Sequence, residues 1–350
     1  MQRDVTGLVA LTKLGILPAA AFGRIVLPRR MVRLGVVGGV LLGDGYDGEM
    51  PRQGHRPRQR VCHGGGCPAG LAAPVTMTAP LPDRVALGTM HGKEAVIAPP
   101  LAALGVTVVL AEVETDRFGT FSGDVPRAGS MIEAARAKAQ AAIAATGLPV
   151  GLASEGAYGP HPHFAFLPFG QELLLWLDVR TGQEVVEMTT DMQPSYDQET
   201  VVDLTAAEAF LTRIGFPETA VIVQPALTAP PLAKGVTDRT ALNAMLDDAF
   251  RLGDSAHLQT DMRAHMNPRR MSVIAGLAQR LAQRLAVPCP TCAAPGFGRL
   301  RSLPGLPCRD CGVETGLIAA EVHGCTACGA EQSLPRDGLA DPGHCPSCNP

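Results

Sequence analysis

Aromatic residues are scarce in this chain of 350 residues, since Phe, Trp and Tyr together make up 4% and there is a single tryptophan. Hydrophobic residues nevertheless reach 46% and charged residues 18%, which excludes a wholly disordered chain. The core is therefore expected to consist mainly of Ala, Val and Leu. The length suits two domains of about 100 to 200 residues each.

Long apolar runs are also lacking. No charge-free run approaches the roughly 18 residues that a membrane span requires, and the longest, Leu14–Gly23 and Leu34–Gly43, are flanked by basic residues. A charged n-region, an apolar stretch and a small-residue cleavage site do not occur in the order typical of a signal peptide. The sequence thus predicts a cytoplasmic protein without a membrane partner.

The net charge of -3 conceals an asymmetry between two parts of the chain. Residues 1–76 carry ten Lys or Arg against four acids, which is +6, whereas the remainder carries 20 against 29, which is -9. Nonspecific binding of duplex DNA depends on neutralising phosphates with basic residues. The acidic remainder therefore argues against a duplex DNA partner.

Residues 1–76 show no sustained helical or strand periodicity, and they are expected to be a largely disordered extension. Met77 directly precedes the first well-patterned strand, so an alternative is a mis-assigned start with translation beginning there. The cluster of Cys62, His63 and Cys67 lies in a Gly-rich tract and is more typical of an incidental grouping than of a site.

Regular patterns begin near residue 83. Strand Val85–Thr89, helix Lys93–Leu104 and strand Val106–Val113 are predicted in succession, which is a β-α-β arrangement. Ser130 and Glu133 have the spacing of a capping box that opens a helix ending at Thr146, with Gly147 as its C-cap glycine. A strand is then predicted over Pro149–Ala153.

The middle of the chain is predicted to form an antiparallel meander of strands Phe164–Phe169, Glu172–Val179 and Glu184–Thr190. A second capping box, Thr205–Glu208, is expected to open a helix ending near Gly215.

Strand Ala220–Val223, helix Arg239–Arg251 and a final helix from Asn267 to about Leu285 complete the predicted elements. The sequence therefore predicts an α/β fold for residues 83–287, as one domain with a mixed sheet.

Eight of the ten cysteines form four Cys-x-x-Cys knuckles within the last 62 residues. The pairs are Cys289/Cys292, Cys308/Cys311, Cys325/Cys328 and Cys345/Cys348. The spacers of 15, 13 and 16 residues are close to those of zinc ribbons, in which the two thiolates of a knuckle reach one tetrahedral ion. The sequence predicts a zinc-ribbon domain over residues 288–350 with two structural zinc ions.

Disulfides or redox-active pairs are the alternative, and four knuckles without an export signal favour metal over both. Two ions would use all eight thiols and leave no coordination position for water, so catalysis at these ions is not expected. The segment has few large apolar residues, and zinc is expected to supply much of its folding free energy. The spacing leaves open whether the knuckles pair in order or interleave.

Two places are candidates for binding an anion. The turn Gly88–Glu94, with His91 and Lys93, lies between a strand and a helix start, where free backbone N–H groups favour phosphate. The second candidate is the start of the final helix, where cations oppose the helix dipole unless an anion lies among them; its residues are Arg263, His265, Arg269 and Arg270. Simple solvation of these side chains is the alternative.

Lysine is rare, since four of the thirty basic residues are Lys, and Lys138 joins Lys93 in a patterned segment as a candidate ligand-binding ammonium. Glu133 and Glu155 are the candidate acids to hold a divalent metal or activate water. The capping box explains Glu133 without any catalytic role. Glu155 is expected just past a strand end, before the loop that starts at Gly156, and no such alternative explains it.

Glu133-Ala134-Ala135-Arg136-Ala137-Lys138-Ala139, then Thr146-Gly147-Leu148-Pro149 and Gly156, resemble the Glu-Asn-Ala-x-x-Lys-Ala, Thr-x-Leu-Pro and Asp-Asp-Ser-Gly motifs of the inosine triphosphatase-like enzymes. These enzymes are pyrophosphatases of non-canonical purine NTPs. The resemblance covers about residues 85–287 and implies their mixed-sheet fold and an Mg²⁺-dependent NTP hydrolase. The family's paired Asp positions are Ala153 and Ser154 here, with the carboxylate displaced to Glu155.

Residues 83–350 also resemble an uncharacterised bacterial family whose motifs precede paired zinc knuckles. The matching segments here are 88–94, 118–123, 154–162 and 261–268. This second resemblance implies no activity.

Three functions follow from these features. The first is an NTP hydrolase in which Lys93, Arg269 and Arg270 hold the triphosphate, and Glu133 and Glu155 hold Mg²⁺. The second is a non-catalytic zinc-ribbon interaction protein whose α/β domain binds a nucleotide or a protein partner.

The third is a catalytic transition-metal site. Its ligands would be His91, His161, His163, His265 and Glu155. Histidines on a loop, such as His161 and His163, are more often ordinary surface groups.

Overall fold

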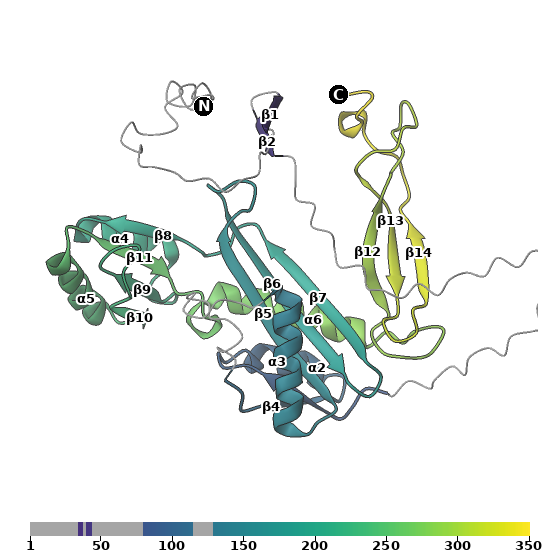
Figure 1. Cartoon of the computed structure of the whole chain (residues 1–350), viewed down its shortest axis with the longest axis horizontal. Helices are drawn as coiled ribbons and strands as arrows, with labels where there is room; N and C mark the ends of the chain where they lie inside the picture. Colours follow the sequence, from purple (N-terminus) through teal and green to yellow (C-terminus); the bar gives the residue numbers. More distant parts are fainter. Residues whose placement is uncertain (1–33, 38–39, 44–79, 115–128) are drawn as a thin grey trace, which may run out of the picture. The chain divides into compact units, whose positions relative to one another are not determined.

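The structure is a computed structural model that describes residues 34–37, 40–43, 80–114 and 129–350 (Figure 1). The chain divides into two units, Met1–Leu71 and Ala72–Pro350. In the first unit, β1 (Leu34–Val37) and β2 (Val40–Gly43) pair as an antiparallel hairpin. The sequence analysis missed this hairpin, although Gly38-Gly39 between two apolar runs is a typical hairpin sequence. The remaining expectations for residues 1–79, including the Cys62/Cys67 cluster and a start at Met77, lie outside the described residues.

A five-stranded mixed sheet forms the centre of the second unit. Its strands follow the order β4 (Thr107–Leu110), β3 (Arg84–Gly88), β5 (Val150–Pro160), β6 (Pro168–Asp178) and β7 (Gln183–Asp191). Strand β3 pairs in parallel with β4 and β5, whereas β5, β6 and β7 pair antiparallel. The predicted α/β class with a mixed sheet is confirmed.

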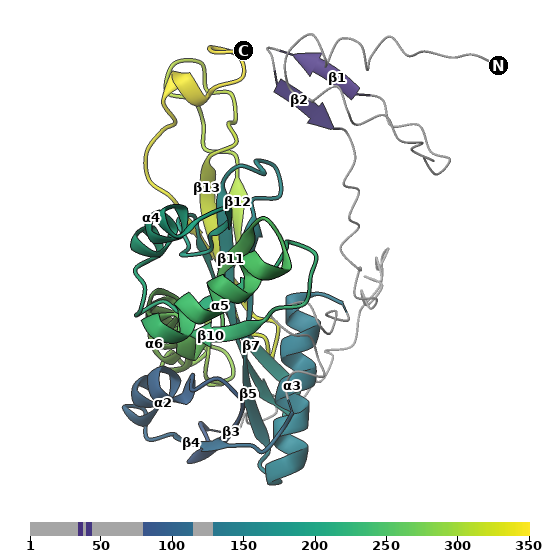
Figure 2. The same ribbon diagram turned by 90° about the vertical axis from the view of Figure 1, so that its left-hand side faces the viewer.

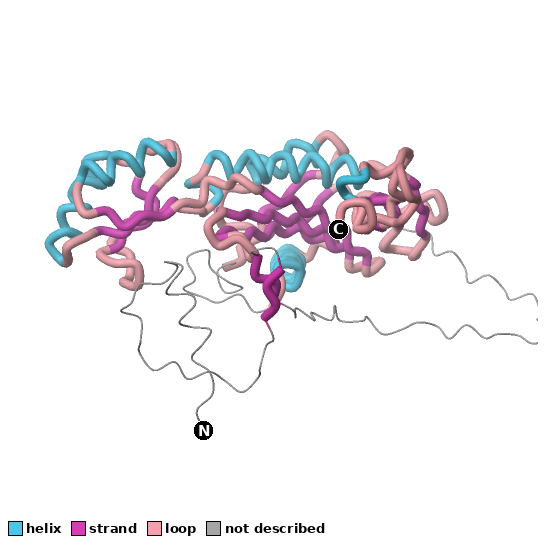
Figure 3. Tube along the Cα trace, turned by 90° about the horizontal axis from the view of Figure 1, so that it is seen from above, coloured by secondary structure: helices cyan, strands magenta, loops and turns pink. Residues whose placement is uncertain are grey.

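Helices cover both faces of this sheet (Figures 2 and 3). Helices α2 (Glu94–Ala102) and α6 (Pro268–Leu285) pack on one face, where Leu152 and Trp176 are buried. Helix α3 (Met131–Thr146) packs on the other, against Ala153 and neighbouring strand residues. Because successive strand residues point to opposite faces, β5 presents its even-numbered side chains to α2 and α6 and its odd-numbered ones to α3.

A second sheet is antiparallel throughout. Its order is β10 (Ala233–Val236), β9 (Val221–Gln224), β11 (Ala256–Thr260) and β8 (Gln198–Val201). Helices α4 (Leu204–Ile214) and α5 (Arg239–Leu252) complete a hydrophobic cluster with it. The prediction of one sheet over residues 83–287 is therefore wrong. These short strands bury their apolar side chains under α4 and α5, and within the described residues they form a sheet of their own.

Two predicted boundaries are also wrong. Strand β5 continues to Pro160, because each of its residues has a partner in β6 along their full length. Residues 161–167 form the connection between β5 and β6 in place of the predicted strand, and Phe166 is 82% exposed there.

The N-terminus of α4 also differs from its prediction, whereas that of α3 is confirmed. Helix α4 is capped by Asp203, whose side chain accepts from the backbone N–H of Ala206, and Thr205 lies inside the helix. The capping box of Ser130 and Glu133 on α3 and the left-handed Gly147 are confirmed.

The C-terminal residues form a three-stranded antiparallel sheet of β12 (Gly298–Pro304), β13 (Ile318–Gly324) and β14 (Glu331–Pro335). The Nε2 of Gln183 in β7 donates to the carbonyl of Pro295 at 2.7 Å, and Arg284 in α6 donates to the carbonyl of Gly296 at 3.2 Å. Across the described part of the chain, no helix combines the length and the apolar character needed to cross a membrane.

Candidate metal centres and candidate anion site

The eight clustered cysteines form two tetrads. Cys289 and Cys292 meet Cys325 and Cys328, whereas Cys308 and Cys311 meet Cys345 and Cys348, and within each tetrad the Sγ atoms lie within 4.8 Å of one another. The knuckles therefore interleave, so that the first pairs with the third and the second with the fourth. Strands β12 and β13 impose this pairing, because they carry the chain from one tetrad to the other and back.

The spacing of the sulfur atoms suits a tetrahedral ion. Between paired knuckles, the Sγ–Sγ distances are 3.7 Å for Cys289–Cys328 and for Cys292–Cys325, 3.9 Å for Cys308–Cys348 and 3.5 Å for Cys311–Cys345. Four sulfurs placed about 2.3 Å from one zinc ion would be about 3.8 Å apart, whereas a disulfide needs about 2.05 Å. None of these eight cysteines forms a disulfide, and each tetrad could hold one metal ion.

Three knuckles share a local backbone conformation that aims both thiols inward. The residue after the second cysteine is left-handed in each, at Ala293 (φ 62°), Gly312 (φ 75°) and Gly329 (φ 74°). Its N–H donates to the carbonyl of the first cysteine, which closes the turn. Glycine adopts this conformation at little cost, and Ala293 is the one non-Gly residue with positive φ among the described residues.

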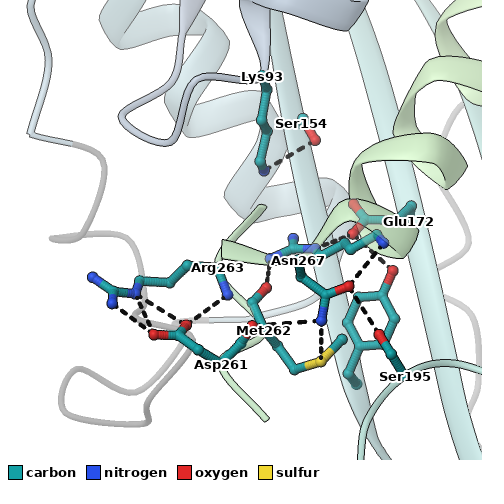
Figure 4. Close-up of polar contacts among 10 residues, drawn as sticks. Lys93, Ser154, Glu172, Ser195, Asp261, Met262, Arg263 and Asn267 are labelled. Atoms are coloured by element: carbon teal, nitrogen blue, oxygen red, sulfur yellow. Dashed lines mark hydrogen bonds and ion pairs between the residues drawn. The ribbon is translucent and has the colours of Figure 1, made fainter. Parts of the chain in front are cut away.

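A separate group of charged side chains lies on the face of the central sheet that α2 and α6 cover (Figure 4). Lys93 follows the turn after β3 and is 7% exposed, and its Nζ donates to the Oγ of Ser154 at 3.2 Å. Among the described residues, no carboxylate comes within 4.0 Å of this ammonium. Burial, followed by the positive charge of Arg270, lowers the pKa of Lys93 to about 8.

Arg270, at the start of α6, is held beside Lys93 by a buried carboxylate. Its Nε donates to Oε1 of Glu172 at 2.5 Å, and the hydroxyl of Tyr158 donates to the same oxygen at 3.0 Å. Glu172 is fully buried, and its Oε2 has no hydrogen-bond partner among the described residues. Lys93, Arg270 and Glu172 together carry a net positive charge while Lys93 is protonated.

Sequence reasoning missed Glu172 and Tyr158. Glu172 lies opposite Gly156 in the β5–β6 register, and the β5–β6 pairing places both residues on the face of Lys93. In the sequence, the signal for a buried carboxylate was the glutamate directly before the apolar run Leu173–Leu177. Its role in the cluster follows only from the pairing register of β5 and β6.

The turn after β3 also meets the segment that precedes α6. The rings of His91 and His265 are stacked with centroids 5.2 Å apart, and a Cβ on Gly92 would lie 3.7 Å from that of His265. The structure therefore brings four predicted anion-binding residues to one region: His91, Lys93, His265 and Arg270. Arg269 points elsewhere, since its exposed side chain pairs with Asp191 at 3.0 Å.

Asn267 fixes the start of α6 in this region. Its Oδ1 accepts from the N–H of Arg270 at 3.0 Å and from the hydroxyl of Ser195 at 2.9 Å. Its Nδ2 donates toward the carbonyl of Asp261 at 3.5 Å, while Asp261 also pairs with Arg263 (Figure 4). These bonds hold the connection between the two sheets against the helix that supplies Arg270.

The predicted acids lie on the other side of the sheet. Glu155 is inside β5 and not past its end, and its buried carboxylate forms an ion pair with Lys138 of α3. Glu133 is exposed and accepts from the N–H and hydroxyl of Ser130 at 2.7 and 2.9 Å, which lowers its pKa. Glu133 lies five residues before Lys138, the partner of Glu155. This separation is about 7.5 Å along α3 and places the two side chains on different faces of the helix.

The histidines of the proposed transition-metal site fall into two pairs. His161 and His163 lie in the β5–β6 connection with ring centroids 5.9 Å apart, and Nδ1 of His161 accepts from two backbone N–H groups nearby. Over residues 80–114 and 129–350, the cysteine tetrads are the groups of three or more metal-binding side chains that come together. No such group contains His91, His265 or Glu155.

The fold and the sites define an α/β protein with a C-terminal module of two interleaved cysteine tetrads. The chain belongs to the family described as a domain of unknown function, DUF6671, whose model matches residues 138–350. No curated protein and no solved structure matches the chain. The matched range includes both tetrads, Ser154, Glu172 and Arg270, and it begins after Lys93. The resemblance to inosine triphosphatase-like enzymes stays a prediction.

Proposed function

We propose that the α/β part binds a phosphorylated small molecule, such as a nucleoside triphosphate, beside Lys93, and that each tetrad holds a structural zinc ion. The observation that carries the first proposal is Lys93 itself, a buried ammonium whose one hydrogen-bond partner among the described residues is a neutral hydroxyl. Buried charges in proteins are normally paired, and an unpaired one favours the binding of an opposite charge.

The surroundings of Lys93 suit phosphate in particular. Gly92 has φ of 66°, and it precedes helix α2, whose first N–H groups carry the positive end of the helix dipole. Arg270 adds a second cation whose charge acts on Lys93. Because Glu172 already pairs with Arg270, one net positive charge is left for a phosphate group to neutralise, and the phosphate oxygens can accept several hydrogen bonds at once.

Binding is better supported than Mg²⁺-dependent hydrolysis. An NTP hydrolase of the inosine triphosphatase type would need acidic residues for the metal, and Glu155 is paired with Lys138 on the opposite face. Glu133 is engaged in capping α3. NTP hydrolysis is therefore an extension of the binding proposal. It is tested by measuring the release of phosphate or pyrophosphate from NTPs in the presence of Mg²⁺.

Zinc is the proposed metal because four thiolates in a tetrahedron are its preferred structural environment. With all four positions occupied by sulfur, such an ion would stabilise the C-terminal module and would not activate water. This module is also the candidate surface for a protein partner, as a non-catalytic interaction protein would require.

Calorimetric titration with canonical and deaminated NTPs tests the binding proposal. For any nucleotide that binds the wild-type protein, Lys93→Met should raise the Kd by at least about tenfold, because it removes the buried cation while keeping much of the side-chain volume. Lys234→Met is the matched control, since Lys234 is exposed on β10 and should leave affinity unchanged. If no nucleotide binds the wild-type protein at millimolar concentration, or if both variants bind equally well, the proposal fails.

A further inference from the structure

Ser154 and Lys93 have the geometry of a nucleophile and its general base. Ser154 Oγ lies 3.2 Å from Lys93 Nζ, and the two side chains are 3% and 7% exposed. A hydroxyl nucleophile requires a base within about 2.6 to 3.2 Å, and lysine can fill this role when its surroundings disfavour the ammonium form. We propose that Ser154 and Lys93 form a catalytic pair that transfers acyl groups from small esters to water.

The state of Lys93 is compatible with this role. A lysine at its usual pKa of about 10.4 is almost entirely protonated at pH 7 and cannot accept a proton. The pKa of Lys93 is lowered to about 8, mainly by burial and then by Arg270. Roughly one molecule in ten then carries the free amine at pH 7, and about half do at pH 8.

The rigid position of Ser154 adds to the argument. It lies within β5, between strand neighbours that are hydrogen-bonded to β6, and it projects to the face of α2. Lys93 reaches it from the N-cap position of α2, so the pair is held between two elements of secondary structure. The charges that act on Lys93 are Arg270 and Lys138, which lower its pKa, and Glu172 and Glu155, which raise it. Arg270 starts α6 on the face of Ser154, and its guanidinium would also stabilise an oxyanion formed there.

The reaction balances with no additional reagent. Ser154 Oγ bonds to the carbonyl carbon while its proton passes to Lys93 Nζ, which gives a tetrahedral oxyanion and an ammonium. The oxyanion collapses, the C–O bond to the alcohol breaks, and the ammonium returns the proton to the leaving oxygen. Water then attacks the acyl-serine through the same proton transfers, releasing the acid and restoring Ser154 and the amine.

Acyl transfer is a function beyond the binding of a phosphorylated ligand. It requires Lys93 as the neutral amine, whereas binding of phosphate requires the ammonium. A bound phosphate would hold Lys93 as ammonium and should therefore inhibit acyl transfer. Inhibition of acyl transfer by inorganic phosphate therefore bears on both proposals, although neither proposal depends on the other. If phosphate fails to slow an otherwise confirmed acylation, the anion site at Lys93 is wrong and the catalytic pair stands.

The test uses the full chain with phenylmethylsulfonyl fluoride and p-nitrophenyl acetate as probes that modify reactive serines. We expect a covalent adduct on Ser154 by peptide mass spectrometry, with a rate that rises with pH around pH 8. Ser154→Ala should abolish the adduct, and Lys93→Met should slow it at least about 100-fold, the usual contribution of a general base.

Two matched controls separate this role from general serine or lysine reactivity. Ser333→Ala removes an exposed hydroxyl on β14, and Lys234→Met removes an exposed ammonium on β10, so both should leave the rate unchanged. Ser154→Cys guards against a folding defect, because its thiol should react with iodoacetamide at a rate that also falls in the Lys93→Met background. Absence of a Ser154 adduct, or an adduct rate that Lys93→Met does not change, would overturn the proposal.

Discussion

At neutral pH Lys93 is mostly protonated, and burial makes this charged form unfavourable in the folded protein. The folded-state pKa of about 8 lies below the ordinary value of 10.5, so the unfolded chain binds more protons between these two values. Stability must therefore rise with pH over this window, and the penalty for burying the ammonium applies in full below pH 8. Such a penalty is typical of a group retained for function.

We therefore predict that wild-type stability increases by about 3 kcal/mol between pH 8 and pH 10.5, in comparison with Lys93→Met. The variant has no titrating group at this position, so the stability difference between the variant and wild type should change across this window and become constant above pH 10.5. Urea unfolding at a series of pH values measures the difference. A constant difference across the window would mean that the pKa of Lys93 is not lowered.

Gly156 is a second residue that the charged cluster requires. A Cβ at this position would lie 2.7 Å from Oε1 of Glu172, and it would clash with the guanidinium of Arg270. We predict that Gly156→Ala destabilises the protein by about 1 to 3 kcal/mol, the usual cost of overpacking a buried site.

Gly159→Ala is the matched control for Gly156→Ala, because it lies in the same strand with no atom within 4 Å of the added Cβ. Thermal unfolding of both variants compares them directly. Equal melting temperatures would show that the cluster can shift to accommodate a methyl group.

Residue-scale features that depend on local spacing could be predicted from the sequence. The four knuckles and the Ser130/Glu133 capping box are both encoded within four consecutive residues. The partnership of Glu172 with Arg270 could not be predicted, because these residues are far apart in sequence and meet only through the β5–β6 register and the packing of α6. The interleaving of the tetrads was undetermined for the same reason.

At the scale of elements, tertiary pairing overrode local propensity in β5. Gly156-Ala157-Tyr158-Gly159-Pro160 resembles a loop, which placed Glu155 past a strand end in the prediction. The antiparallel partner β6 extends along the whole segment and keeps it in the sheet. The separate sheet of β8–β11 was missed because four- and five-residue strands carry no signal of which sheet they join.

Helix N-caps provide a prediction at this scale. Asn267→Ala should cost about 2 kcal/mol or more, because it removes the cap of α6 and leaves the part-buried hydroxyl of Ser195 without its acceptor. Asp203→Ala removes the exposed cap of α4 and should cost about 1 kcal/mol. Urea unfolding measures both, and a larger loss for Asp203→Ala would contradict the role of Asn267 in joining the two sheets.

At the scale of the whole molecule, the two tetrads differ in how they join the rest of the protein. Cys289, Cys292 and Cys325 are buried in a hydrophobic cluster with Ala294 and Phe297. The neighbouring carbonyls of Pro295 and Gly296 accept from β7 and α6. Cys328 is the one exposed cysteine of this first tetrad, whereas two are exposed in the second, Cys311 and Cys348, and β12, β13 and β14 separate the second tetrad from these contacts. The first tetrad is thus part of the packing of the α/β part, whereas the second stabilises mainly its own knuckles.

We therefore predict unequal effects from removing one ligand of each tetrad. Cys292→Ser and Cys348→Ser should each reduce the zinc content from two ions per chain to one, since three thiolates hold the ion far less tightly than four. Hydrogen exchange should then show a loss of protection at the end of α6 and in β7 for Cys292→Ser, because the segment 293–297 loses its anchor. For Cys348→Ser the loss should be confined to the knuckles around Cys308 and Cys345.

Elemental analysis gives the metal content, and equal loss of protection at α6 in both variants would contradict this division. Wild-type protein purified without any zinc would instead remove the structural-zinc proposal itself.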